Sequence, residues 1–328
     1  MNNAVKDFSD LIKAERTVVL FPHENPDGDA IGSCAALCLA LRSIGREAYV
    51  ALDEKMPHNL DFMEESCRLD IPKAVIDGEF LGVLVDCGHP SRIGKRAALF
   101  EKATRTACVD HHLNDGREFA FDFYVIDPKS AATGELAFLI IKELGGEVTL
   151  PVANALFTAI TTDTGNFQHS NTTKRTHEIT AQLYDAEGFD PKAVSVLIYD
   201  RQSAGSVKMK ANVLENLEIS EDGKLAIGHV TQELLKETGC DMSESDGIIN
   251  AIMSLDGVEI GVLLKESGEN RIKVSLRAKT YVNVAEIAQI LGGGGHVRAA
   301  GATVEGTADE VRSSVKDLCM KALNADPA

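Results

Sequence analysis

Short apolar runs alternate with helical patterns over the first half of the chain, and this rhythm limits the folds that the chain can adopt. The runs have the length and the β-branched content of buried strands, and they cover residues 17–21, 48–52, 81–85, 104–109 and 123–126. The segment 31–44, between the first two runs, is apolar on nearly every side, as a helix packed between a sheet and other helices is. Parallel strands need long, usually helical crossovers, so the pattern predicts a mainly parallel sheet flanked by helices.

The chain has 328 residues, more than one hydrophobic core usually organises, and two domains are therefore expected. The first domain continues with helical patterns at 132–144, 151–161 and 174–186, and Gly188 and Pro191 suggest its end. The second half mixes strand patterns at 217–230, 257–265, 271–278 and 300–304 with helical patterns at 203–216, 244–254, 283–291 and 308–323. We expect an α/β domain over 1–188, a linker over 189–207 and a smaller α+β domain over 208–328.

Charge and composition exclude several classes of partner. The formal net charge of −17 repels polyanions, so a long duplex nucleic acid is an unsuitable substrate and a nucleic-acid substrate should be short. No apolar run approaches the roughly 20 residues that span a bilayer, and the first residues show no basic leader followed by an apolar stretch. The seven cysteines are scattered without a CxxC pair, which is typical of a reducing compartment. These features predict a cytoplasmic protein without a membrane segment.

The segment HENPDGD directly follows the first predicted strand and contains His23, Asp27 and Asp29. Alternate residues of an extended segment project to the same side, so these three side chains can converge. Pro26 is expected to hold Asn25 extended, and Gly28 to permit the turn into the next helix. The alternative is that Asp27 or Asp29 only caps that helix, which would leave His23 unexplained.

Further acidic and histidine residues follow later apolar runs. Asp86 ends one predicted strand, Asp110 ends another with His111 and His112 behind it, and Asp163 follows the apolar run 151–160. Each aspartate alone could be a capping or turn residue, but strand ends of a parallel sheet meet at one edge, where such folds bind ligands. Clustered carboxylates repel one another unless cations neutralise them.

A pair of divalent cations is the simplest way to neutralise such a cluster. Histidine and carboxylate ligands without thiolate fit Mn²⁺ or a related ion better than structural Zn²⁺. Two such ions about 3.5 to 4 Å apart form the clamp used in phosphoryl chemistry.

The segments HENPDGDAIGS, VDCG, VDHH and TDTG, in this order, resemble the four motifs of the DHH phosphoesterase family. The segment GGGGHVRAAG at 292–301 resembles the signature of the DHH-associated C-terminal domain, so the resemblance runs over essentially the whole chain. The two-domain length is most similar to the stand-alone nanoRNase and pAp phosphatase (NrnA-like) members.

The resemblance implies two divalent metal ions, Mn²⁺ first, with Mg²⁺ and Co²⁺ as alternatives. It assigns one ion to His23, Asp27 and Asp86, and the other to Asp29, Asp86, His111 and Asp163. Two further residues would be catalytic: Asp110 supports the site from behind, and His112 faces the substrate, where it stabilises or protonates the leaving group.

The second domain carries candidate substrate contacts. The run RIKVSLRAK alternates strictly between basic or polar and apolar residues, which for most of its basic residues indicates only a solvated strand face. The resemblance aligns Arg277 with a phosphate ligand, and Gly294, Gly295 and His296 with a nucleotide-binding loop, expected here as a polyglycine turn. Phe167 could stack on a base, but a packed phenylalanine is the commoner explanation.

The resemblance therefore implies hydrolysis of short oligoribonucleotides (nanoRNA) to nucleoside 5'-monophosphates, of pAp to AMP, or of cyclic dinucleotides or linear pApA. The substrate is expected between the domains, with its end bound by the second domain. One alternative is a manganese-dependent inorganic pyrophosphatase, against which the GGGGH segment argues. Another is an inactive nucleotide-sensing protein, which should have lost at least one ligand, whereas all are present. A homodimer is left open.

Overall fold

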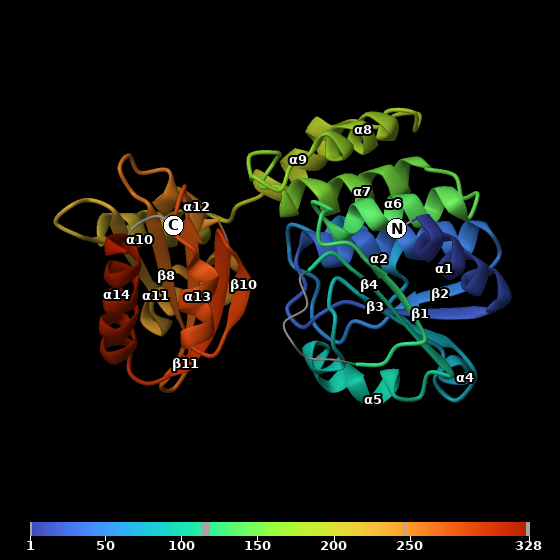
Figure 1. Ribbon diagram of the computed structural model, residues 1–328, viewed down its shortest axis with the longest axis horizontal. Coiled ribbons are helices and arrows are strands. Elements are labelled where there is room, and N and C mark those ends of the chain that lie inside the picture. The colour runs from blue at the N-terminus through green and yellow to red at the C-terminus, as the bar shows by residue number, and fades with distance from the viewer. Residues whose placement is uncertain (1, 113–118, 246, 326–328) are drawn as a thin grey trace. The chain divides into compact units, whose positions relative to one another are not determined.

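The computed structural model describes residues 2–112, 119–245 and 247–325. The chain divides into two compact units, Met1–Arg201 and Gln202–Ala328, each with its own sheet and its own hydrophobic core (Figure 1). Both units mix helices and strands, so the expected fold class is confirmed.

The first unit is built on a five-stranded sheet in the order β2-β1-β3-β4-β5, in which every neighbouring pair is parallel. Its strands are β1 (Thr17–Phe21), β2 (Glu47–Val50), β3 (Leu81–Val85), β4 (Arg105–Asp110) and β5 (Phe123–Ile126). The order reverses direction between β1 and β3, so the loops leaving these two strands diverge. This is the point at which open parallel sheets bind ligands.

Helices cover both faces of this sheet, as Figure 1 shows. The larger core lies under α1 (Asn2–Ala14), α2 (Gly28–Ser43), α6 (Thr133–Glu143) and α7 (Leu150–Asp163). The opposite face packs against the short helices α4 (Lys73–Ile76) and α5 (Ala97–Phe100), with Phe21, Phe80 and Phe100 in its core. A further short helix, α3 (Glu64–Cys67), precedes α4. Sequence reasoning missed α1, although Val5, Phe8, Leu11 and Ile12 recur at helical spacing and are buried.

The first unit ends later than the sequence suggested. After α8 (Lys174–Leu183) comes α9 (Pro191–Tyr199), which lies inside the expected linker 189–207 and packs Val194 and Ile198 into the larger core. Pro191 is at the first position of this helix, and the side chain of Asp190 caps it. Proline is as suited to the start of a helix as to a loop, so it is an ambiguous boundary signal.

The second unit holds a six-stranded sheet in the order β10-β11-β9-β8-β7-β6, in which β7 and β8 are parallel and all other pairs antiparallel. Its strands are β6 (Glu218–Ile219), β7 (Leu225–Val230), β8 (Ile260–Gly268), β9 (Arg271–Ala278), β10 (Gly294–His296) and β11 (Ala299–Glu305). The helices α13 (Val284–Ile290) and α14 (Ala308–Asn324) cover one face. The other face packs against α10 (Ala204–Glu215), α11 (Gln232–Thr238) and α12 (Ile248–Met253).

Among the described residues, no helix combines the length and the apolar content needed to cross a membrane.

Candidate metal centre

The carboxyl ends of β1, β3 and β4 and the end of α7 bring the predicted ligands of the first unit together. Their nitrogen and oxygen atoms form three groups, in each of which all ligand atoms lie within 4.8 Å of one another. The groups are His23 with Asp27 and Asp86, Asp29 with His111 and Asp163, and Asp86 with Asp110 and His112. Asp86 belongs to two of them and its Oδ1 lies 3.7 Å from His111 Nε2 of the third, so the groups form one continuous site.

Backbone carbonyls orient the two histidines that face these carboxylates. His23 Nδ1 lies 2.8 Å from the carbonyl oxygen of Glu24, and His111 Nδ1 lies 3.1 Å from that of Ser130. A carbonyl oxygen can only accept, so Nδ1 carries the proton in both rings. In the neutral ring, the lone pair of each Nε2 then faces the acidic groups, as a metal ligand requires.

The distances around Nε2 suit shared coordination better than hydrogen bonding. His111 Nε2 lies 3.7 Å from Asp29 Oδ2, 3.7 Å from Asp86 Oδ1 and 3.5 Å from Asp163 Oδ2. His23 Nε2 lies 3.6 Å from Asp86 Oδ2 and 3.8 Å from Asp27 Oδ1. Two ligands bound about 2.1 Å from one ion are roughly 3 to 4 Å apart, which matches this spacing.

The N-terminus of α6 holds Asp29 and Asp86, the two most buried carboxylates of these groups. Asp29 accepts hydrogen bonds from the backbone N–H of Thr133 at 2.7 Å and of Gly134 at 2.9 Å, and from Ser33 Oγ at 3.0 Å. Thr133 Oγ1 donates to Asp86 Oδ1 at 2.8 Å. Asp86 has a φ of +62°, a left-handed conformation that is costly for an aspartate and is found where the surrounding structure imposes it.

The loop from His23 to Asp29 differs from the extended segment that the sequence predicted. Asn25 has a φ of +50° and donates its N–H to Glu54 Oε2 at 2.8 Å, so the chain turns before Pro26. Asp27 caps α2 by accepting the N–H groups of Asp29 and Ala30, both at 3.1 Å. The capping alternative therefore holds for Asp27, which also lies beside His23.

At position 28, glycine is needed because another residue packs closely against it, and not because the backbone adopts an unusual angle. A Cβ at this position would overlap the side chain of Thr162 in α7, and its φ is not in the left-handed region. The absence of a side chain thus lets the start of α2 approach the end of α7, which carries Asp163.

The acidic groups strain one another in the absence of a cation. Burial, and then the charges of Asp86, Asp163 and Asp27, raise the pKa of Asp29 well above its usual range. Burial also raises the pKa of Asp163 to about 7, with Asp86 and Asp27 adding to it and His111 opposing. Burial would lower the pKa of His23, but Asp27 and Asp86 outweigh it and raise the value to about 10.

These shifts indicate that the cluster needs positive charge to keep its carboxylates ionised. Two divalent cations would carry the same charge, of opposite sign, as the carboxylates of Asp27, Asp29, Asp86 and Asp163. The donor set is oxygen and imidazole nitrogen, and the three groups contain no cysteine. The residues therefore fit divalent cations that prefer such ligands.

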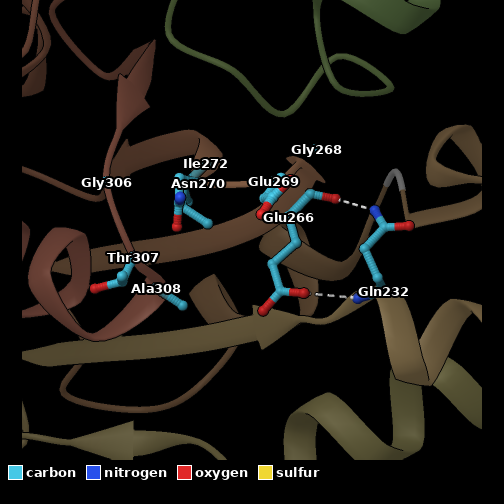
Figure 2. A pocket seen from close by; sticks show the side chains of 9 residues that line it. All are labelled: Gln232, Glu266, Gly268, Glu269, Asn270, Ile272, Gly306, Thr307 and Ala308. Atoms are coloured by element: carbon cyan, nitrogen blue, oxygen red, sulfur yellow. Dashed lines mark hydrogen bonds between the residues drawn. The ribbon is translucent and has the colours of Figure 1, made fainter.

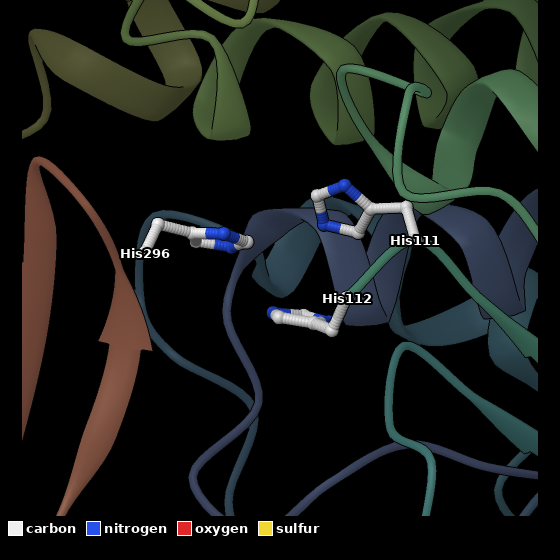
Figure 3. Close-up of side chains that lie close together, drawn as sticks. All are labelled: His111, His112 and His296. Atoms are coloured by element: carbon white, nitrogen blue, oxygen red, sulfur yellow. The ribbon is translucent and has the colours of Figure 1, made fainter. Parts of the chain in front are cut away.

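Asp110 and His112 form a separate pair at the edge of the site. His112 Nδ1 lies 2.7 Å from Asp110 Oδ1, and the same oxygen accepts the backbone N–H of His112 at 3.1 Å. Burial opposes protonation of His112, but Asp110 and Asp86 outweigh it and raise the pKa of His112 to about 9. Figure 3 shows the neighbouring rings of His111 and His112, whose centroids are 4.6 Å apart. The side chain of His112 is 40% exposed, whereas that of His111 is 4% exposed.

In the second unit, the predicted phosphate contacts share one row across the sheet. His296 in β10 pairs with Ala299 in β11, Ala299 pairs with Arg277 in β9, and Arg277 pairs with Gly261 in β8. Directly opposed residues project to the same face, so Arg277 and His296 flank the small side chain of Ala299.

The glycines before His296 form a strand instead of the expected turn. Gly294 and Gly295 pair with Gly301 and Ala300, and a Cβ on Gly295 would lie 2.6 Å from Ala300 Cα. Glycine is therefore needed for the close approach of β10 to β11.

A hollow of about 470 Å³ lies toward the other end of β9 (Figure 2). It is lined by Gln232, Glu266, Gly268, Glu269, Asn270, Ile272, Gly306, Thr307 and Ala308. Its charged lining residues are acidic, and Glu266 Oε2 accepts the N–H of Gln232 at 2.9 Å. Such a lining disfavours a phosphate group.

Phe167 packs against other aromatic rings, which is the commoner of the two explanations that the sequence offers. Its ring stacks on His177 with centroids 5.5 Å apart and lies 6.1 Å from the ring of Phe157. Protein contacts thus occupy the ring, and its role in base stacking stays a prediction.

Sequence reasoning missed several residues that orient the ligands. Besides Thr133 and Ser130, Asn171 donates its side-chain N–H to the carbonyl of Asp163 at 3.2 Å. For Ser130 and Thr133, the sequence offered one signal. The segment SAATGE after β5 places small and hydroxyl residues directly before an apolar helix, which is typical of a helix start.

Comparisons with known proteins agree with this architecture. Residues 17–162 match the family model described as the DHH family, N-terminal domain, and residues 222–321 match the DHHA1 domain. An exopolyphosphatase-related protein from Bacteroides fragilis has the same fold, with a TM-score of 0.87 over 98% of this chain and 96% of that one, at 24% identity.

Two relatives that are similar to this chain in sequence are named as enzymes. The bifunctional oligoribonuclease and PAP phosphatase NrnA of Thermus thermophilus is 32% identical over 91% of this chain and 87% of its own length. The cyclic-di-AMP phosphodiesterase GdpP of Geobacillus thermodenitrificans is 26% identical over 94% of this chain and 48% of its own length. With both domain models matched in order, the chain belongs to the DHH family and is a phosphoesterase, a hydrolase of phosphate esters.

Proposed function

We propose that the protein uses two divalent cations to hydrolyse short oligoribonucleotides to nucleoside 5'-monophosphates and pAp to AMP, with linear pApA or cyclic dinucleotides as further substrates. The observation that carries the proposal is the continuous cluster in which Asp86 joins the group of His23 and Asp27 to the residues around His111. The names of the Thermus and Geobacillus relatives support the substrate class.

The cations, when bound, would supply Lewis acidity and a water of lowered pKa. His23, Asp27 and Asp86 would hold one ion, and Asp29, Asp86, His111 and Asp163 the other. Mn²⁺ is the proposed ion, with Mg²⁺ and Co²⁺ as alternatives, because these ions accept mixed oxygen and imidazole ligands.

Asp110 and His112 are proposed as the acid that serves the leaving group. Asp110 accepts the Nδ1 proton of His112, which fixes the ring and favours its charged form. The Nε2 proton of His112 is then available to the departing oxygen of the substrate.

Arg277 and His296, with Gly294 and Gly295, are proposed to bind a terminal phosphate of the substrate. The small residues Ala299 and Gly261 beside Arg277 leave the row free of bulky neighbours within the sheet. A guanidinium can bind a phosphate through two hydrogen bonds, which a lysine cannot reproduce.

This assignment is tested with Arg277→Lys. We expect KM for a 5'-phosphorylated dinucleotide to rise roughly tenfold or more, because a charge-assisted hydrogen bond contributes about 1.5 to 3 kcal/mol, while kcat is retained. Lys273→Met, on the same face of β9, is the control and should leave KM unchanged. Equal effects of the two substitutions would refute the specific role of Arg277.

The proposed activity is tested with di- to pentaribonucleotides, pAp, pApA, cyclic di-AMP and pyrophosphate, each with Mn²⁺ and with Mg²⁺. Asp86→Asn should abolish turnover, whereas Asp61→Asn, which breaks the ion pair with Arg201 outside the clusters, should not. Full manganese-dependent turnover by Asp86→Asn would contradict the proposal, and turnover of pyrophosphate alone would favour the pyrophosphatase alternative.

A further inference from the structure

The segment Ser130–Thr133, here called the 130–133 segment, contacts the residues around one of the two proposed ion positions. The carbonyl of Ser130 orients His111, and Thr133 donates its N–H to Asp29 and its hydroxyl to Asp86. Ser130 is 4% exposed and the other three residues are fully buried. The segment therefore lies directly behind three proposed ligands.

A fourth ligand is tied to the same segment through Asn171. Its Nδ2 donates to the carbonyl of Ala131 at 2.9 Å and to the carbonyl of Asp163 at 3.2 Å. Asp163 lies at the end of α7, so Asn171 links the position of that helix end to the 130–133 segment. The side chains of Asp29, Asp86, His111 and Asp163 thus depend on one short piece of chain.

This piece of chain is irregular, so neither a helix nor a strand ladder fixes it up to Ala132. Arg175, in the first turn of α8, does so instead. Its Nη2 donates to Ser130 Oγ at 2.7 Å, and Nη1 and Nη2 both reach Asp127 Oδ2 at 3.1 Å. Ser130 Oγ donates in turn to the same oxygen of Asp127 at 3.1 Å.

Glu135 holds Arg175 from the other side. It is fully buried in the first turn of α6, where its Oε2 accepts Arg175 Nε at 2.7 Å and its Oε1 accepts Thr176 Oγ1 at 2.6 Å. A buried carboxylate without a partner is strongly unfavourable, so the pair of Arg175 and Glu135 resists displacement. The guanidinium therefore clamps α6 and the turn at Asp127 from the start of α8.

His23, by contrast, has no part in these contacts. Its Nδ1 bonds to Glu24, and the described contacts of Arg175, Glu135 and the 130–133 segment do not include His23 or Asp27. Asp86, which accepts the hydroxyl of Thr133 and also faces His23, links the clamp to this side of the site.

We propose that Arg175 and Glu135 are positioning residues that set the affinity of the ion position formed by Asp29, His111 and Asp163, while the position of His23 and Asp27 depends on them only through the shared Asp86. The inference rests on the proposed function, because it needs the two ion positions. It follows from a chain of contacts: the Arg175 guanidinium bonds to Ser130, and the carbonyl of Ser130 orients the ring of His111 and hence its Nε2.

The test is a Mn²⁺ titration of the metal-free full-length protein, followed by electron paramagnetic resonance of the free ion. For Arg175→Met and Glu135→Gln we expect one of two binding steps to weaken by roughly 10- to 100-fold, the usual effect of losing a group that orients a ligand. The other step should weaken much less, because only Asp86 connects it to the clamp. Arg175→Lys should keep part of the affinity, because it preserves the charge but not the fork of donors.

Arg201→Met is the matched control. The side chain of Arg201 is 28% exposed, as is that of Arg175, and it also donates through two nitrogens to one carboxylate, that of Asp61. This substitution should leave both Mn²⁺ steps unchanged. Turnover by Arg175→Met should recover at saturating Mn²⁺, which a global loss of structure would not allow.

The outcomes separate the two proposals. Folded variants, checked by circular dichroism, that bind both ions as the wild type does would overturn the positioning role, as would equal weakening of both steps. If Arg175→Met does not fold, Thr176→Val is titrated in its place; it removes the hydroxyl that donates to Glu135 and that also accepts the backbone N–H of Thr173. A wild-type protein that binds no Mn²⁺ would instead overturn the metal centre itself.

Discussion

His111 and His112 are adjacent in the chain but have different surroundings. The ring of His111 is buried among carboxylates with Nδ1 bonded to a backbone carbonyl, whereas that of His112 is 40% exposed and bonded to Asp110. A histidine held by a carbonyl presents a lone pair, while one held by a carboxylate favours the protonated form. One motif therefore places the proposed ligand and the proposed acid side by side.

Substituting each histidine by asparagine should separate these roles. We expect His112→Asn to lower kcat by roughly 10² to 10⁴, the usual contribution of a general acid, with Mn²⁺ affinity retained. His111→Asn should weaken Mn²⁺ binding instead. For each variant, kcat is measured at saturating Mn²⁺ and the Mn²⁺ affinity by titration. If His112→Asn instead weakened Mn²⁺ binding and His111→Asn lowered only kcat, the two assignments would be exchanged.

At the scale of elements, the contact between α2 and α7 positions two proposed ligands from distant parts of the chain. Asp29 lies in the first turn of α2, and Asp163 is the last residue of α7. Gly32 lies where the two helices meet, since an added Cβ would be 2.5 Å from the carbonyl oxygen of Ala155 and 2.8 Å from the nitrogen of Ala159. Because these are backbone atoms, α7 itself would have to move.

Gly32→Ala should therefore destabilise the first unit, although alanine is the better helix former. Overpacking costs about 1 to 3 kcal/mol, which exceeds the gain of about 1 kcal/mol in helix propensity. Urea unfolding followed by circular dichroism measures the difference. Gly268→Ala, where the new Cβ meets only Arg271 Cβ at 3.8 Å, should be neutral, and a stabilised Gly32→Ala would disprove the packing argument.

In the second unit, a buried carboxylate joins the start of β8 to the turn after β9. Glu259 accepts the N–H groups of Thr280, Tyr281 and Val282 and the hydroxyl of Thr280. Burial opposes its ionisation, but these donors outweigh it and lower the pKa of Glu259 below its ordinary value of 4.5. The ionised form is thus the one that the fold requires.

A lowered folded-state pKa contributes stability that is present above pH 4.5 and is lost as the pH falls through the folded value. Unfolding of the second unit should therefore become easier in that acid range. Glu259→Gln should lower its stability at neutral pH and remove this part of the acid dependence. An unchanged pH dependence in thermal unfolding scans of the variant would show that Glu259 does not contribute.

At the scale of the whole molecule, each unit has its own core, and all proposed metal ligands lie in the first. A ligand that binds only the native state stabilises it, by about 2.7 kcal/mol at a hundred times its dissociation constant. We expect Mn²⁺ to raise the unfolding temperature of the first unit and to leave that of the second unchanged.

Differential scanning calorimetry with Mn²⁺ and with EDTA tests this expectation. Asp86→Asn is the control, because it removes the ligand shared by both positions and should abolish the shift. A shift of equal size in both transitions would contradict the assignment of the metal centre to the first unit.

Much of this protein was readable in the sequence because the relevant patterns are local. Alternation of apolar runs and helices specified a parallel sheet, and residues at strand ends meet at one edge whatever the details of packing. The types of His23, Asp86 and Asp163 then indicated the chemistry. The strict alternation of β9 likewise located its buried face, which the structure confirms residue by residue.

Only the tertiary structure decided what orients those residues. Asp29 and Thr133 are 104 positions apart, and neither Arg175 nor Asn171 belongs to a pattern that points to the site. Their contacts depend on how α6, α7 and α8 dock, which single-element periodicity does not encode. The sequence by itself determined which side chains could bind an ion. The packing of distant helices determined the orientation of those side chains, because the neighbours of a side chain fix its direction.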